Sequence, residues 1–114
     1  MKNTNIYVVH GYTSSSQSEW FPWLKEQVKN IQVKIDIPDM PDSKNPHLET
    51  WLNHLRKNAL DIDENTIFIG HSLGCVTALR YILEKNIKIK GAILVSGFIN
   101  ENLVNLDIIW DKYN

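Results

Sequence analysis

The feature that most constrains this fold is an alternation of short apolar runs with longer amphipathic stretches. The runs are rich in β-branched residues and predict strands, and the stretches between them carry apolar residues at helical spacing. The predicted strands are residues 6–9, 33–37, 66–69 and 92–95, and the predicted helices are residues 20–28, 48–59 and 73–83. This order predicts right-handed βαβ crossovers. We therefore expect an α/β fold with three layers (α/β/α) and a mostly parallel sheet of about four strands.

The patterns also predict which side chains face the core. Alternation of Val33, Ile35 and Ile37 with polar residues is typical of a strand at a sheet edge. Several tryptophans and aliphatic residues lie at helix-face positions, where core packing is expected. These are Trp20, Trp23, Trp51, Val76, Leu79, Ile82 and Leu83. Residues 100–114 show a further, rougher helical spacing that includes Trp110.

Composition excludes several classes of protein. A length of 114 residues suits one domain over residues 1–114, and a formal net charge of −1 gives no patch for nucleic acid or an anionic membrane. One cysteine, Cys75, excludes an internal disulfide and a cysteine-rich metal site. Residues 1–9 lack the long apolar segment of a signal peptide, so we expect a cytoplasmic protein. We expect no cofactor, because neither G-x-G-x-x-G nor a P-loop is present.

One motif carries chemistry. Residues 70–74, Gly-His-Ser-Leu-Gly, match G-x-S-x-G directly after a predicted strand and directly before a predicted helix. In that setting the serine lies on a tight turn that exposes its hydroxyl, and the glycines give the turn room. Amides at the helix start then face developing negative charge. The motif predicts Ser72 as a nucleophile and the Leu73 amide as an oxyanion donor; a plain connecting turn is the alternative.

A second segment predicts another oxyanion donor. His10-Gly11-Tyr12 ends the first predicted strand, and in α/β-hydrolases a loop after an earlier strand supplies the second oxyanion donor. The amide of Tyr12 is our candidate for that donor.

Together these motifs resemble the small serine hydrolases of the α/β-hydrolase superfamily, the family of YdeN-like and retinoblastoma-binding protein nine-like proteins. The resemblance rests on segments that occur in one order along the chain: residues 10–15, 20–24, 40–41, 51–52, 70–75 and 94–98. It implies an α/β-hydrolase fold without a large cap domain. It also implies Ser72 as nucleophile and carboxylesterase-like activity on small ester or related acyl substrates.

The base and the acid of a catalytic triad are the missing parts. The triad order of this superfamily is Ser, Asp or Glu, then His, but none of the histidines at positions 10, 47, 54 and 71 follows Ser72. We therefore expect a truncated α/β-hydrolase fold that holds the nucleophile half, with doubtful activity alone. His10 is a candidate substitute base, and a loop-bracing hydrogen bond is its alternative role. Cys75 is expected to be a small buried helix residue rather than a nucleophile.

Two further expectations follow. A binding or interaction protein that keeps the hydrolase half-fold without catalysis is the alternative to a serine hydrolase. The strand at Ala92–Val95 would form a sheet edge with an apolar face, and such edges recruit other chains. We expect a homo-oligomer through this edge or through the last predicted helix.

Overall fold

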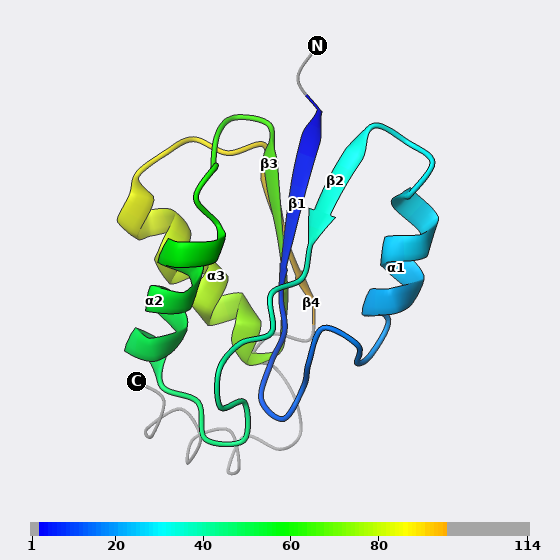
Figure 1. Ribbon diagram of the computed structural model, residues 1–114. Coiled ribbons are helices and arrows are strands. Elements are labelled where there is room, and N and C mark those ends of the chain that lie inside the picture. The colour runs from blue at the N-terminus through cyan, green and yellow to red at the C-terminus, as the bar shows by residue number, and fades with distance from the viewer. Residues whose placement is uncertain (1–2, 96–114) are drawn as a thin grey trace.

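The computed structural model describes residues 3–95, in which strands and helices alternate along the chain (Figure 1). The elements are β1 (Thr4–Val9), α1 (Phe21–Val28), β2 (Val33–Asp36), α2 (Leu48–Asn58), β3 (Thr66–His71), α3 (Leu73–Lys85) and β4 (Gly91–Val95). Every strand pair is parallel, and the order across the sheet is β2-β1-β3-β4. The predicted α/β class and parallel sheet are confirmed. The helical spacing predicted for residues 100–114 lies outside the described residues.

The helices cover the two faces of the sheet unequally. Figure 1 shows α1 on one side of the sheet and α2 with α3 on the other. Because side chains alternate along a strand, Tyr7 and Phe68 point toward α2 and α3, where their rings stack at 5.5 Å. Ile6 and Val8 point the other way and pack with Phe21 of α1. The sheet therefore has a buried core on each face.

The strand β2 forms one edge of the sheet, as its alternating pattern predicted. Val33 and Ile35 are half-buried, whereas Lys34 and Asp36, which alternate with them, are exposed. Exposed charges of this kind oppose pairing with another chain. The exposed Lys34 and Asp36 are therefore expected to keep another strand from pairing with β2.

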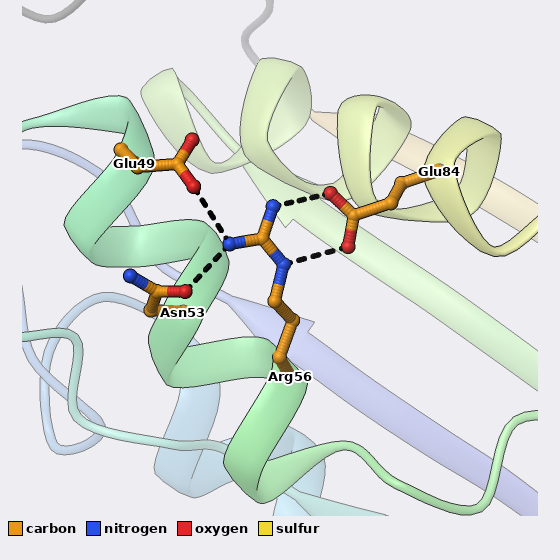
Figure 2. Close-up of polar contacts among 4 residues, drawn as sticks. All are labelled: Glu49, Asn53, Arg56 and Glu84. Carbon is orange, nitrogen blue, oxygen red and sulfur yellow. Dashed lines mark hydrogen bonds and ion pairs between the residues drawn. The ribbon is translucent and has the colours of Figure 1, made fainter.

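The pairing of α2 with α3 has a buried and an exposed part. The Tyr81 hydroxyl donates to the Ala59 carbonyl at 2.8 Å inside the core. On the surface, the Arg56 guanidinium donates two hydrogen bonds to the Glu84 carboxylate, with Nε 2.7 Å from Oε2 (Figure 2). The same guanidinium reaches Glu49 at 2.8 Å and Asn53 at 2.6 Å. These contacts raise the pKa of Arg56 and lower that of Glu84, so both groups stay charged. The contact with Glu84 joins α2 to α3, whereas those with Glu49 and Asn53 stay within α2.

Some predicted core positions are wrong, and helix geometry explains why. Trp23 is 63% exposed, because it lies about 200° around α1 from the buried Phe21. Leu79 and Leu83 are 41% and 74% exposed, since α3 turns the face carrying Tyr81 toward the sheet. Trp51 is fully buried and Trp20 half-buried, whereas Trp110 lies outside the described residues.

Candidate active site

Ser72 occupies a strained turn between β3 and α3. It has φ 57° and ψ −123°, a backbone conformation that residues with a side chain rarely adopt. Its amide donates to the Val95 carbonyl of β4 at 3.0 Å, and its carbonyl accepts from the Cys75 amide at 3.0 Å. The sheet and the helix therefore hold the turn from both sides. Strain held in this way at a residue with a hydroxyl is characteristic of a functional site.

The glycines of the motif are needed for room rather than for positive φ. A methyl group on Gly74 would lie 2.0 Å from the Val9 carbonyl oxygen, and one on Gly70 would lie 2.7 Å from the Cys75 Cα. Neither distance is possible between nonbonded heavy atoms. The first turn of α3 can therefore rest against the end of β1 only because the motif carries glycines.

Gly11 brings the loop after β1 directly against this turn. A methyl group on Gly11 would lie 2.9 Å from the Ser72 Cβ and 3.3 Å from the Leu73 nitrogen. Two segments about sixty residues apart in the sequence, each singled out by its motif, thus lie in contact. The predicted juxtaposition of the His-Gly-Tyr segment with the serine turn is present in the structure.

The two predicted oxyanion donors have free amides in the described part of the chain. Neither the Tyr12 amide nor the Leu73 amide donates to an acceptor within residues 3–95. Leu73 begins α3, so its N–H also lies at the positive end of the helix dipole. Both amides are available to a negatively charged oxygen.

His10 is fully buried, and both of its ring nitrogens have backbone partners. Nε2 accepts from the Met40 amide at 2.9 Å, and Nδ1 lies 3.0 Å from the Gly11 carbonyl. Because an amide only donates and a carbonyl only accepts, the ring is neutral with its proton on Nδ1. Burial lowers the pKa of His10 below its ordinary value. This geometry favours the loop-bracing role over that of a substitute base, because the lone pair of Nε2, which a base would need, already accepts the hydrogen bond from the Met40 amide.

The other three histidines differ in burial, and none of them is hydrogen-bonded to Ser72 within residues 3–95. His71 places its ring about 6 Å from the rings of Trp20 and Phe21, and its buried Nδ1 has no partner among the described residues. His47 is exposed just before α2, and His54 is half-buried within it. No hydrogen bond joins any of these rings to Ser72 within residues 3–95.

Cys75 is a buried helix residue, as predicted. It is 2% exposed, its Sγ lies 3.5 Å from the Val95 carbonyl, and burial raises its pKa. A raised pKa disfavours the thiolate that a nucleophilic cysteine needs.

No sequence pattern predicted the contribution of the loop between β2 and α2. Met40 is 4% exposed, and its amide holds His10; Asp39 accepts from the Ser16 amide at 2.7 Å. The sequence marks this loop only by its prolines and by the Met40-Pro41 pair, and neither feature indicates which distant residues the loop contacts.

The described residues contain no cluster of three or more histidine, cysteine or acidic side chains that could hold a metal ion. Among the helices of residues 3–95, none combines the length and the apolar character needed to cross a membrane.

Comparisons with known proteins agree with this geometry. Residues 6–109 match the family model described as serine hydrolase. The chain is 43% identical over 95 residues to the putative hydrolase YdeN of Bacillus subtilis, which covers 82% of this chain and 50% of that protein. It is 32% identical over 83 residues to the serine hydrolase RBBP9 of Rattus norvegicus, covering 72% of this chain and 43% of that protein. The chain thus spans about half the length of these relatives.

Solved structures give the same result for the fold. The crystal structure of the Bacillus subtilis ydeN gene product superposes with a TM-score of 0.82 and 36% identity, over 98% of this chain and 61% of that one. An extracellular α/β-hydrolase from a Paenibacillus species, at 13% identity, shares the fold with a TM-score of 0.68 over 85% of this chain and 42% of that one. The strained serine turn thus lies in an α/β-hydrolase fold of which this chain matches a part, and the chain belongs to the serine hydrolase family.

Proposed function

We propose that this chain supplies the nucleophile half of a carboxylesterase-like hydrolase that cleaves small ester or related acyl substrates through Ser72. The observation that carries the proposal is the positive φ of Ser72 at a turn against which the Gly11 backbone packs. We propose that this arrangement sets the Ser72 hydroxyl near the Leu73 and Tyr12 amides, neither of which donates to an acceptor within residues 3–95. Membership of the serine hydrolase family supports hydrolase chemistry. The preference for ester substrates is part of the proposal.

The proposed reaction proceeds through an acyl-enzyme. The Ser72 Oγ attacks the substrate carbonyl carbon while its proton passes to a base, and the resulting oxyanion accepts hydrogen bonds from the Leu73 and Tyr12 amides. Collapse of this intermediate expels the alcohol, which takes up the proton. Water then hydrolyses the acyl-serine ester, releases the acid and restores the hydroxyl.

The source of the base is the incomplete part of this mechanism. His10 already uses both ring nitrogens, so we propose that the base comes from a polypeptide segment other than residues 3–95. Without that base, we expect only feeble turnover from this chain alone. Oxyanion stabilisation and binding leave roughly 10³–10⁴-fold acceleration over water when triad members are lost.

Hydrolysis of p-nitrophenyl acetate, compared between the wild type and Ser72→Ala, tests the proposal. A slow rate that disappears in the variant supports catalysis by Ser72. Equal rates in the two proteins would favour the second candidate, a binding or interaction protein that keeps the half-fold. The absence of a histidine hydrogen-bonded to Ser72 among the described residues is the observation that favours this alternative.

We also propose that a second copy of the chain pairs with β4. Within residues 3–95, β4 pairs with β3 alone, it contains no charged residue, and Ile93 and Leu94 are 52% and 46% exposed. These properties contrast with the charged edge at β2. A cytoplasmic location, and the absence of nucleic-acid and membrane partners, stay predictions from the sequence.

A further inference from the structure

The loop of residues 38–43, between β2 and α2, holds the loop that carries Tyr12 at three places. The Met40 amide donates to His10 Nε2 at 2.9 Å, and the Thr13 amide donates to the Ser43 carbonyl at 2.8 Å. The third contact joins the Ser16 amide to Asp39 Oδ1 at 2.7 Å. The contacts are spaced three residues apart at positions 10, 13 and 16. Tyr12 therefore lies inside a segment that is fastened on both sides.

The holding loop is itself firmly placed. Two prolines, Pro38 and Pro41, restrict its backbone, and Met40 is buried in the core beneath α2. The indole N–H of the fully buried Trp51 donates to the Pro41 carbonyl at 2.7 Å. A segment fixed to the core in this way can transmit its position to the loop that it contacts.

Among the three contacts, the one made by the exposed Asp39 has a charged acceptor. The hydrogen bond from the Ser16 amide is the main reason that the pKa of Asp39 lies below its ordinary value. The carboxylate is therefore ionised at neutral pH, and hydrogen bonds to charged acceptors are stronger than neutral ones. Because Asp39 is exposed, its removal should leave the core intact.

We propose that the loop of residues 38–43 is a brace that positions the Tyr12 amide for oxyanion binding, with Asp39 as a positioning residue acting through Ser16. The inference rests on the proposed function, since it deepens the role given there to Tyr12. Under this proposal the Met40-Pro41 segment and Asp39 help to position an oxyanion donor, although they lie outside the G-x-S-x-G motif.

The test compares three variants of the full chain. Asp39→Ala removes the acceptor, Asp39→Asn keeps an uncharged acceptor oxygen, and Asp42→Asn is the matched control. Asp42 lies in the same loop, is exposed, and makes no side-chain hydrogen bond among residues 3–95. Its φ of 50° is one that asparagine also tolerates. The readouts are the NMR shifts and exchange rates of the Ser16 and Tyr12 amides, the unfolding midpoint, and the rate of fluorophosphonate labelling.

We expect Asp39→Ala to speed exchange at Ser16, shift the Tyr12 amide and slow labelling roughly tenfold or more, since losing a whole oxyanion donor costs roughly 10²–10³. For Asp39→Asn, the Ser16 exchange rate, the Tyr12 amide shift and the labelling rate should lie between those of Asp39→Ala and the wild type. The unfolding midpoint of Asp39→Ala should fall only slightly below that of Asp42→Asn, because the lost hydrogen bond is exposed. Slower labelling together with a shifted Tyr12 amide is the result that a merely structural role for Asp39 would not give.

An unchanged Tyr12 amide in Asp39→Ala overturns the brace, as does a shifted amide with wild-type labelling. If the wild type is not labelled at all, the proposed function fails, and the Tyr12 amide shift alone then decides whether the brace exists.

Discussion

The backbone of Gly11 lies so close to Ser72 that a methyl group at position 11 would stand 2.9 Å from the Ser72 Cβ. This contact joins the loop after β1, which continues into Tyr12, to the turn after β3, which continues into Leu73. The candidate site depends on this approach.

Substitution of Gly11 by alanine should separate the two segments. The added methyl group also lies 2.9 Å from the His71 carbonyl oxygen, so the backbone must move. We expect slower fluorophosphonate labelling by roughly one to two orders of magnitude, because the proposed oxyanion donor, the Tyr12 amide, moves out of place. Overpacking should cost about 1–3 kcal/mol in the free energy of unfolding. Labelling at the wild-type rate would contradict the role given to this contact.

Alanine at Gly74 should be more damaging, and Gly91 offers a matched control. The methyl group at position 74 meets the Val9 carbonyl oxygen at 2.0 Å, whereas one at position 91 has no atom within 4 Å. We expect Gly74→Ala to lose about 3 kcal/mol or more of unfolding free energy. Gly91→Ala should be neutral or slightly stabilising. Urea unfolding measures both; equal effects would show that the close approach of α3 to β1 does not limit stability.

Stability should fall in mildly acidic solution because of His10. Burial lowers its pKa from the ordinary value of 6.5, so the unfolded chain takes up a proton before the folded chain does. The free energy of unfolding should therefore decrease as pH falls from 6.5 toward the folded pKa, by at most about 1.4 kcal/mol per pH unit. Urea unfolding between pH 5 and about 8, compared with His10→Phe, measures this contribution. Identical pH dependence in the two proteins would show that His10 is not its source.

A charge in the middle of β4 should prevent self-association. Ile93 is 52% exposed on this edge, and Ile93→Lys places an ammonium group where the proposed partner strand would pair. We expect sedimentation to show an oligomer for the wild type and a monomer for the variant. Leu60→Lys, at a leucine that is 68% exposed outside β4, should still associate. A wild-type chain that is monomeric at micromolar concentration would end the proposal.

Local patterns were sufficient to predict the helices and strands and the turn that carries Ser72. The apolar runs gave the strands, and the G-x-S-x-G pattern between a strand and a helix placed Ser72 at its turn. They were insufficient for choosing helix faces, because α3 has apolar residues on several sides. Spacing alone could not decide between Tyr81, which is buried, and Leu83, which is exposed.

Contacts between distant loops were beyond the sequence patterns for a different reason. The hydrogen bonds from Met40 to His10 and from Ser16 to Asp39 join residues 30 and 23 positions apart. They depend on how β2 lies beside β1, which no local periodicity specifies. The two backbone partners of His10 likewise became known only from the folded arrangement.

Fluorophosphonate labelling of Ser72 tests the central claim most directly, because the probe phosphonylates an activated serine without needing a complete catalytic cycle. Intact-mass analysis followed by peptide mapping of the wild type, Ser72→Ala and the control Thr50→Ala, at an exposed hydroxyl of α2, should show slow labelling at Ser72 in the wild type and the control. Ser72→Ala should remain unlabelled. A wild-type chain that takes up no label, or a Ser72→Ala chain labelled as fast as the wild type, would contradict the account.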